Sequence, residues 1–512
     1  MKKQSDFYRS FRMLFFVIFI LAFSLFYLHN PAEATDYFVT TSGAGSCTQG
    51  APCNLQTAIG IAGDGDTIYV ASGTYEGSGD NVIEITYSIN LLGGWNGSSS
   101  GGVVRDPDTY ITTLDGEDTR RVIHISGSGE TPMIDGFTIT NGNATGLITD
   151  CTGTGGSAPD GCGGGIFVYL ADPVISNNVI SNNYAATTSI GAYQGYGGGI
   201  YIRDSSSAQI TDNEFNSNTG SSIYQGRGGA VYIDISDSGV SIINNNFNNN
   251  VASTVSTGWG GAIHIASSDP LIQGNTIENN QASTVASSSG SGIYLWYGSS
   301  TICNNLVVNN PRGVAVYLGH FGGIFEANRV LENPAHTAVN LINSDGSSAT
   351  ITNNIIEGTD TNTISFDSSG ETLTATLKHN TIVGNGAQYG IYIQDYCEVY
   401  MWNNIIANHS TTGVHVDDFS TCIVTQDRNL FWGNTSSGET GINPVFGDPA
   451  FRDSSSSDYH IKRNSAAIDA GVNTGFTTDI DGDARPKGSG YDIGADEFCA
   501  NTLSGIIMML LN

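Results

Sequence analysis

Basic residues are scarce in this 512-residue sequence. It has 18 Lys and Arg residues against 48 Asp and Glu residues, which gives a formal net charge of −30. A protein that binds nucleic acid needs a basic surface to neutralise phosphates, so we expect no nucleic-acid partner. Charged residues make up 13% of the chain. This low share excludes a coiled coil or a helical bundle, which are rich in Ala, Glu, Lys and Leu.

Long apolar runs are also few. One runs over Met13–Leu28, after a basic start and before Ala32-Glu33-Ala34, and this layout predicts a secretory signal peptide over residues 1–34. An uncleaved N-terminal anchor is the alternative, although the run is shorter than the roughly 20 residues that span a bilayer. After signal removal we expect no transmembrane span, because the apolar tail 500–512 is short. The predicted location is secreted or cell-surface.

The eight cysteines fit an exported protein, since disulfides form in oxidising compartments. Three pairs lie close enough in sequence, or about one repeat apart, to be disulfide candidates: Cys47 with Cys53, Cys151 with Cys162, and Cys397 with Cys422. Cys303 and Cys499 have no obvious partners. Zinc is a poor interpretation, because no Cys-x-x-Cys pair or Cys/His cluster has ligand spacing.

Glycine and asparagine, in contrast, are abundant, and they accompany two short repeated patterns. The first is small residue, aliphatic, outward residue, aliphatic, and its copies begin at residues 165, 199, 230, 262, 292, 315, 338, 363, 390 and 413. The second is Asn-x-aliphatic/aromatic-x-x-Asn, as in Asn213–Asn218 and Asn245–Asn250, and it has the same spacing. Fixed periods of this length indicate a solenoid.

The composition of each repeat predicts the type of solenoid. Its segments alternate with a period of two and are too short for helices. Alternate aliphatics would fill the interior, while Asn tolerates tight left-handed corners and bonds the Asn one rung above. We therefore predict an all-β, right-handed parallel β-helix stabilised by rung stacking.

The ends of the repeat region set the domain boundaries. Residues 35–130 are expected to form an N-terminal cap and the first rungs, with a capping helix at 54–62 and a first strand at 65–70. The repeats occupy 131–440, and residues 441–499, which lose the Asn pattern, are expected to form a small separate C-terminal domain.

These motifs carry a family resemblance. The rungs and the segment from Leu55 to Trp95 resemble the right-handed parallel β-helix, or pectin-lyase-like, superfamily. The C-terminal motifs Ala467–Gly471, Asp479–Pro486 and Asp492–Glu497 are similar to the choice-of-anchor Q domain of exported bacterial proteins. The superfamily includes pectate lyases, polygalacturonases, other polysaccharide-active enzymes and adhesins, so the resemblance implies the fold but does not by itself assign a function. The polygalacturonase motif order is not matched, since Gly319-His320 precedes Asp417-Asp418.

One candidate site is a row of aromatic residues. The outward position of the first pattern should stack Phe167, Tyr201, Tyr232, His264, Tyr294 and Tyr317 along one face, with Tyr196, Arg227 and Trp259 beside them. Exposed aromatics suit the apolar faces of sugars. The predicted substrate-binding residues are Tyr196, Tyr201, Arg227, Tyr232, Trp259, His264, Tyr294 and Tyr317. The alternative is an aromatic ladder that only stabilises the solenoid.

A second candidate site is acidic. Asp395 and Asp418 are one local rung apart, and carboxylates about 5 Å apart match a retaining glycosidase pair. With Asp417 and His415 they are the candidate catalytic residues, and a shared Ca²⁺ or simple hydration is the alternative. Lys378, which could in principle abstract a uronate proton, is more simply a solvated side chain. Asp479, Asp481 and Asp483 resemble a shortened calcium loop, so calcium is the candidate cofactor, with a structural pairing of Arg485 to a carboxylate as the alternative.

Together these patterns predict an exported, monomeric β-helix protein that binds a polysaccharide or other glycan through its aromatic face. The alternative is a polysaccharide lyase or glycoside hydrolase that acts on an extracellular polysaccharide. The sequence contains no complete catalytic set, which favours the binding protein.

Overall fold

The structure is a computed structural model that describes residues 34–147, 160–187, 194–205, 207–236, 239–285, 288–343 and 345–499. The predicted signal peptide up to residue 33, Cys151 and the C-terminal tail lie outside the described residues. Within those residues, no helix is long and apolar enough to cross a membrane.

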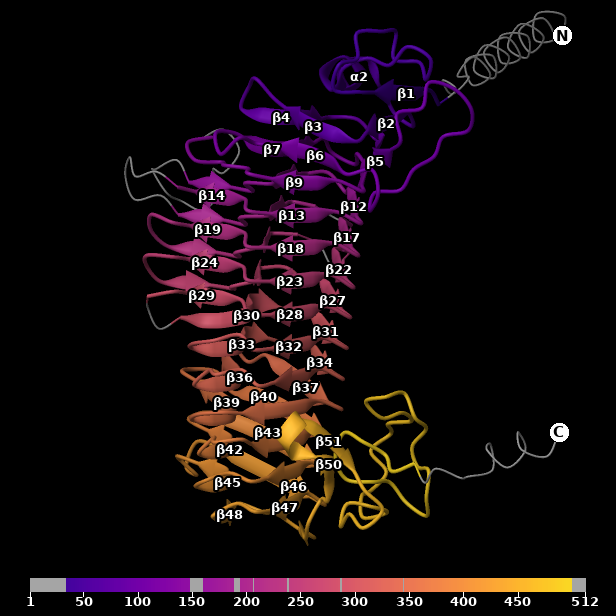
Figure 1. Ribbon diagram of the computed structural model, residues 1–512. Coiled ribbons are helices and arrows are strands. Elements are labelled where there is room, and N and C mark those ends of the chain that lie inside the picture. Colours follow the sequence, from indigo (N-terminus) through magenta and orange to yellow (C-terminus); the bar gives the residue numbers. More distant parts are fainter. Residues whose placement is uncertain are drawn as a thin grey trace, which may run out of the picture.

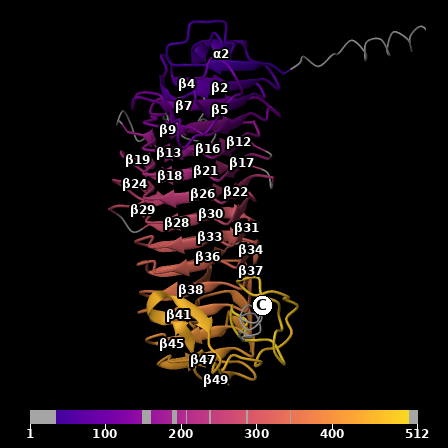
Figure 2. The ribbon, with the colours of Figure 1, turned by 45° about the vertical axis from the view of Figure 1, so that its right-hand side comes forward.

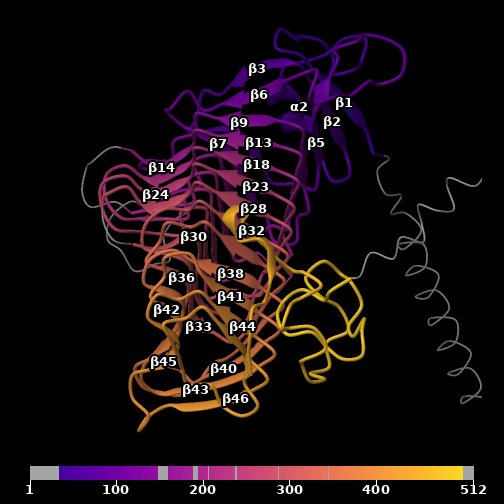
Figure 3. The ribbon, with the colours of Figure 1, turned by 60° about the horizontal axis from the view of Figure 1, so that its bottom comes forward.

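The chain winds into a tall parallel β-helix with three long sheets, as the repeats predict (Figure 1). Each rung contributes to each sheet, the longer middle rungs with two short strands in the second sheet, and the strands of these sheets pair in parallel with their counterparts one rung away. An oblique view with the lower end brought forward shows the successive rungs wound around a common axis (Figure 3).

The strands of the first sheet are β1 (Asp36–Val39), β2 (Thr67–Ala71), β5 (Asn90–Trp95), β8 (Met133–Asp135), β12 (Val174–Ser176), β17 (Gln209–Thr211), β22 (Ser241–Ile243), β27 (Leu271–Gln273), β31 (Thr301–Cys303), β34 (Ile324–Glu326), β37 (Ser348–Thr352), β40 (Leu373–Lys378), β43 (Cys397–Trp402) and β46 (Ile423–Asp427). The strands of the second sheet are β4 (Asn81–Ile85), β7 (Arg121–Ser126), β10 (Gly161–Cys162), β11 (Ile166–Tyr169), β15 (Gly195–Tyr196), β16 (Ile200–Arg203), β20 (Gly226–Arg227), β21 (Val231–Asp234), β25 (Gly258–Trp259), β26 (Ile263–Ala266), β30 (Ser289–Gly298), β33 (Val314–Phe321), β36 (Thr337–Asn343), β39 (Asn362–Ser368), β42 (Tyr389–Ile393), β45 (Thr412–Val416) and β48 (Ser436–Gly438).

The strands of the third sheet are β3 (Gly73–Glu76), β6 (Thr112–Asp115), β9 (Thr138–Thr140), β13 (Val179–Ser181), β18 (Glu214–Asn216), β23 (Asn246–Asn248), β28 (Thr276–Glu278), β32 (Leu306–Val308), β35 (Arg329–Leu331), β38 (Ile355–Gly358), β41 (Thr381–Gly384), β44 (Ile405–Ala407), β47 (Leu430–Trp432) and β49 (Val445–Phe446). A smaller side sheet, formed by the longer middle rungs, consists of β14 (Tyr184–Ala186), β19 (Thr219–Ser221), β24 (Val251–Ser253) and β29 (Gln281–Ser283).

Inward side chains fill the coil as predicted. Ile200, Ile210 and Phe215, one from each sheet of the same rung, are fully buried. Identical positions stack between rungs, and the rings of Phe215 and Phe247 lie parallel with centroids 4.6 Å apart. A single rung buries too little apolar surface to be stable alone, so rung stacking supplies the stability of the solenoid.

Buried asparagines form two ladders along the solenoid. The first ladder contains Asn178, Asn213, Asn245, Asn275, Asn305, Asn328, Asn354, Asn380, Asn404 and Asn429, with Nδ2–Oδ1 distances of 2.9–3.1 Å between neighbours. The second contains Asn183, Asn218, Asn250, Asn280, Asn310 and Asn333, with the same range of distances. The predicted side-chain ladder is therefore confirmed.

The left-handed corner and the ladder use different residues, although the sequence pattern assigned both to one Asn. Positive φ occurs at the residue before the laddered Asn, for example Asn244 (φ 56°) before Asn245 and Asn249 (φ 57°) before Asn250. This preceding residue turns the chain, which aims the following amide into the stack.

The N-terminal end carries the expected helix. It is α2 (Leu55–Ile61), it is capped by the side chain of Asn54, and it packs Leu55 and Ala58 against the core at one end of the coil (Figure 1). The first strand, however, is β1 and not residues 65–70, because Asp36–Val39 pairs in register with β2.

The C-terminal residues beyond β49 run back along the solenoid and cover the C-terminal part of the third sheet (Figures 1 and 2). They include β50 (Phe451–Asp453), the short 3-10 helix η1 (Ser454–Ser456) and β51 (Asp458–Ile461). Tyr459 and Ala495 pack on Ile355 and Val383, while Ile461, Ala467 and Ile493 pack on Ile405 and Leu430. Beneath this segment, apolar residues occupy four outward positions of β38, β41 and β44, namely Ile355, Val383, Ile405 and Ala407, whereas the outward positions of β18 and β23 are all polar.

Candidate functional site

The predicted aromatic row stacks in register. Centroid distances between successive rings from Phe167 to Tyr317 are 5.3, 5.1, 4.9, 4.7 and 4.6 Å. Its exposure was predicted wrongly. Tyr201 and Tyr232 are each 1% exposed, and His264, Tyr294 and Tyr317 are also buried.

The residues expected beside the row cover it instead. The Tyr196 ring lies 5.2 Å from the Tyr232 ring, and the Arg227 guanidinium lies 5.5 Å from the ring centroid of Tyr196 and 5.3 Å from that of Trp259. Gly228, at φ 64°, turns the chain back at the end of β20. The longer middle rungs thus fold over the row. Tyr196, Tyr201, Tyr232 and His264 are buried in an aromatic ladder, while Arg227 and Trp259 lie beside it and are partly exposed.

The second sheet is open where the rungs shorten. From β30 to β45 we define the open face by two outward rows of residues. One row is Tyr294, Tyr317, Asn340, Ser365, Tyr392 and His415, and the other is Trp296, Gly319, Ile342, Asp367, Gln394 and Asp417. Within these rows Tyr294, Tyr317, Ser365 and Gly319 are buried by their neighbours, and the other residues are partly or fully exposed. No strand of the side sheet follows β29 among the described residues, which explains why this part of the sheet is not covered.

Trp296 is the large aromatic residue at the β30 end of the open face. Its ring is parallel to those of Tyr294 and Tyr317, each at 6.3 Å. A Cβ atom at Gly319 would collide with the indole ring, so a glycine is required beneath Trp296. Trp296 itself is only half-buried, and it therefore presents an aromatic surface to solvent.

Asp417 lies at the β45 end of the open face, where it accepts hydrogen bonds from two neighbouring side chains. Its Oδ2 accepts a hydrogen bond from the Tyr392 hydroxyl at 2.7 Å, and its Oδ1 lies 3.0 Å from His415 Nε2. The Tyr389 ring packs 5.1 Å from Tyr392 and 5.0 Å from His415. The side chains of His415 and Asp417 are 34% and 43% exposed, so this cluster is accessible to a ligand.

The electrostatics define the protonation states in this cluster. The hydrogen bond from Tyr392, followed by that from His415, lowers the pKa of Asp417. Burial and the bond to Asp417 raise the pKa of Tyr392 to about 12. At neutral pH Asp417 is therefore a charged acceptor and Tyr392 a protonated donor.

The other two candidate catalytic residues contact different groups. Asp418 Oδ1 accepts the Ser420 backbone N–H at 2.8 Å and thereby caps a turn. Asp395 lies near Asp367, whose pKa is raised by burial and by the charge of Asp395. Of the four predicted residues, the structure joins only His415 and Asp417.

A polar hollow of about 680 Å³ flanks the open face at the corner between the second and first sheets. Tyr297 and His320 occupy equivalent left-handed corner positions (φ 62° and 51°), and their rings stack at 4.0 Å. Asp345 lies 3.3 Å from His320 Nδ1. Trp296, Tyr297, His320, Asp345 and Tyr389 were missed from the sequence, and the aromatic character of the residues that end the strands was the only signal.

The predicted calcium loop is not formed. Asp479 accepts the backbone N–H groups of Asp481, Asp483 and Glu497 at 2.8–3.0 Å. The other two carboxylates contact different side chains: Asp481 contacts Arg329 and His460, and Asp483 contacts Lys487. The three carboxylates do not converge. His460, Asp481 and Asp496 do lie together, but Arg329 already neutralises Asp481 at 2.6 Å.

Arg485 instead pairs with a carboxylate, as the alternative interpretation had it. Its buried guanidinium lies 3.1 Å from Glu497 and donates to the carbonyls of Asp492 and Gly494. It also lies 3.2 Å from Nδ1 of buried His379, which comes from the corner of the solenoid after β40. The C-terminal motif residues therefore fix this segment to the coil.

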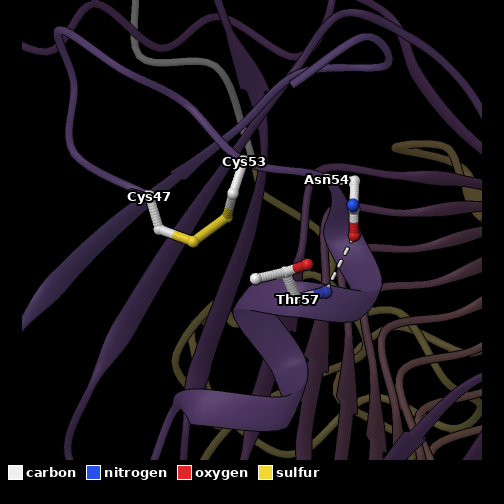
Figure 4. Close-up of a disulfide and its surroundings, with 4 residues drawn as sticks. All are labelled: Cys47, Cys53, Asn54 and Thr57. Atoms are coloured by element: carbon white, nitrogen blue, oxygen red, sulfur yellow. Dashed lines mark hydrogen bonds between the residues drawn. A yellow bond between two sulfur atoms is a disulfide. The ribbon is translucent and has the colours of Figure 1, made fainter. Parts of the chain in front are cut away.

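The cysteine predictions have mixed outcomes. Cys47 and Cys53 form the expected disulfide, next to the helix cap (Figure 4). Cys162 is disulfide-bonded, while its expected partner Cys151 lies outside the described residues. Cys397 and Cys422 are free, which corrects the predicted bond. Their thiols donate to the carbonyls of Asp395 and Gln394, and burial raises the pKa of Cys397.

These features define a parallel β-helix protein with one open aromatic and acidic face. A family described as the right handed beta helix region matches residues 121–330, 229–399 and 291–466, and the chain belongs to this family. A family of unknown function, DUF1565, matches residues 40–196. A comparison with curated proteins finds no match. The choice-of-anchor Q resemblance is not matched by either family.

The chain is similar to several solved structures. A pectate lyase, Pel9A, is 12% identical, with 91% of this chain and 96% of that one covered and a TM-score of 0.31. The A-module of an Azotobacter vinelandii mannuronan C-5 epimerase, AlgE4, is 15% identical, with 77% and 94% covered and a TM-score of 0.35. The Agl-KA catalytic domain is 15% identical, with 81% and 69% covered and a TM-score of 0.39. At these identities the similarity concerns the fold alone.

Proposed function

We propose that this chain is an exported protein that binds a polysaccharide along the open face. The observation that carries the proposal is the exposed cluster of Tyr389, Tyr392, His415 and Asp417 on the same face as Trp296. Half-buried aromatic rings pack on the apolar faces of sugars, and a fixed carboxylate and phenol orient hydroxyl groups.

The dimensions of the open face suit a chain ligand. It extends over six rungs, from Trp296 to Asp417. Because neighbouring strands are about 4.8 Å apart, these five spacings measure about 24 Å. Several sugar units would fit along this length. The polar hollow that contains Tyr297 and His320 lies beside the β30 end. The proposed export is consistent with the Cys47–Cys53 disulfide.

Glycan binding tests this proposal. We expect the chain to be retained on at least one member of a panel of neutral and acidic polysaccharides, and Trp296→Ala to weaken binding by about tenfold or more, as for an aromatic anchor. Tyr392→Phe removes one hydroxyl and should weaken it less. Affinity electrophoresis and calorimetry measure both effects.

The matched control is Trp432→Ala, because Trp432 is 43% exposed but lies on β47 of the third sheet. It should leave binding unchanged. Equal losses in Trp296→Ala and Trp432→Ala, or no retention on any polysaccharide of the panel, would contradict the proposal.

A polysaccharide lyase or hydrolase remains the second candidate function, and the Asp417 contacts favour it specifically. Asp417 is a charged base held by a phenol and an imidazole, which are the groups that general acid–base catalysis uses. New reducing ends or unsaturated products that disappear in Asp417→Asn would support this candidate. Retention without any product would support the binding protein.

A further inference from the structure

A second, smaller hollow lies on the first sheet, away from the open face. It measures about 330 Å³ and is lined by Lys378, Trp402, Asp427 and the loop residues Val472–Thr474. Lys378, Trp402 and Asp427 occupy the same position on β40, β43 and β46, one rung apart. The hollow therefore combines an ammonium group, an indole ring and a carboxylate in one row.

The loop wall of this hollow is held in place. Val472 N–H donates to Asn403 Oδ1 at 2.9 Å, and Asn403 Nδ2 donates to the Val472 carbonyl at 2.7 Å. Thr474 Oγ1 lies 2.7 Å from Nε2 of His379. His379 and Asn403 directly follow Lys378 and Trp402 in the chain. The residues that line the hollow on the first sheet are therefore adjacent in sequence to the residues that hold its loop wall. The hollow is thus preformed, which lowers the entropic cost of binding.

The cation in this hollow is available to a ligand. Lys378 Nζ lies 5.6 Å from the Trp402 ring centroid, and among the described residues it has no carboxylate within ion-pair distance. By contrast, Lys487, Arg329 and Arg485 are paired with carboxylates at 2.6–3.1 Å. In a chain with a net charge of −30, an unpaired ammonium beside an aromatic wall is an unusual local feature.

We propose that this hollow binds an acidic sugar unit, one that carries a carboxylate or a sulfate. The Trp402 indole packs on the pyranose ring, the Lys378 ammonium pairs with the anionic group, and Asp427, Asn473 and Thr474 contact hydroxyl groups. Tyr400 extends the aromatic surface along β43, since its ring is parallel to that of Trp402 with centroids 6.2 Å apart. An acidic peptide offers a charge but not the ring and hydroxyl groups that this wall suits.

The test uses the full chain with two matched probes. One is an oligouronate, and the other is the same oligosaccharide with its carboxylates reduced to alcohols. Lys378→Gln should weaken oligouronate binding about tenfold or more while leaving the reduced probe unaffected. Trp402→Ala should weaken both. A sulfated oligosaccharide that also loses affinity in Lys378→Gln would place sulfate within the accepted class.

The controls separate this site from the open face. Lys462→Gln and Trp432→Ala should leave both probes unaffected, and the Lys378→Gln effect should persist in a Trp296→Ala background even if the open face binds nothing. Unchanged oligouronate affinity in Lys378→Gln would overturn the proposal. So would a poly(glutamate) peptide that binds as tightly as the oligouronate, because charge alone would then explain the binding.

Discussion

Replacing His409 with asparagine is expected to reduce the acid sensitivity of the protein. His409 is fully buried, and its ring bridges Asn434 Oδ1 at 2.9 Å and Thr363 Oγ1 at 3.0 Å. Burial lowers its pKa to about 4. It stands where other rungs place an asparagine of the second ladder, since its backbone N–H also donates to Asn434 Oδ1. Asparagine is therefore a replacement that fits this position and does not titrate.

The direction of the effect follows from the lowered pKa. As the pH falls below about 6.5, the unfolded chain binds a proton at this histidine before the folded chain does, so stability that is present above pH 6.5 is lost on acidification. Each unit of pH costs about 1.4 kcal/mol per such proton. For His409 the loss approaches about 3 kcal/mol near pH 4.

Two further histidines act in the same direction. Burial lowers the pKa of His264 and of His379 to about 3 in each case. Asp492 opposes them, because its burial raises the pKa of its carboxyl to about 6 and lets the folded chain bind a proton in this range. Comparing the protein with its own variant cancels this opposing contribution.

Urea unfolding between pH 7 and pH 4 measures the effect as the difference between the protein and His409→Asn. The expected difference grows as the pH falls. His336→Asn is the control for replacing a histidine at the surface, because the His336 side chain is 70% exposed. A His409→Asn curve parallel to that of the unmodified protein would show that this imidazole does not bind the proton that the argument requires.

The sequence predicts the solenoid well because its determinants are periodic. A residue such as Tyr201 is placed above Tyr232 by rung length alone, so stacking could be inferred without knowing any contact. Burial of the same residues could not be inferred, since it depends on the path of Ser- and Gly-rich insertions that have no period. The family match supports this view, as it covers the periodic region and extends little beyond it.

The candidate sites also contain some residues that sequence spacing predicts and others that it does not. His415 and Asp417 are two residues apart on the outer side of one strand end, so sequence spacing alone joins them. Trp296, by contrast, depends on the missing side chain of Gly319 one rung away. The hollow around Lys378 depends on a loop that returns from residues 472–474. Non-periodic contacts of this kind determine the shape of the candidate sites but leave no pattern in the sequence.

Asn280→Ala, a change within the second ladder, is expected to produce a large loss of stability. Its Nδ2 donates to the Phe247 carbonyl at 2.9 Å, and its Oδ1 accepts the backbone N–H of Asn250, also at 2.9 Å. Alanine leaves the buried Asn250 N–H without its acceptor and removes one hydrogen bond to the Phe247 carbonyl. Because an unpartnered buried group costs about 1–3 kcal/mol and a lost hydrogen bond about 1 kcal/mol, we expect a loss of about 2–4 kcal/mol.

Asn216→Ala is the matched control for this prediction. Asn216 lies on β18 of the third sheet but points outward and is only half-buried, so its removal should cost no more than about 0.5 kcal/mol. Urea unfolding followed by circular dichroism and by tryptophan fluorescence measures both variants. Each rung contacts mainly its neighbours, so the parts of the solenoid on either side of a weakened rung can unfold independently. Different unfolding midpoints by circular dichroism and by fluorescence in Asn280→Ala would therefore show that the two parts no longer unfold together. Equal stability of the two variants would show that the ladder amides orient the corners without stabilising them.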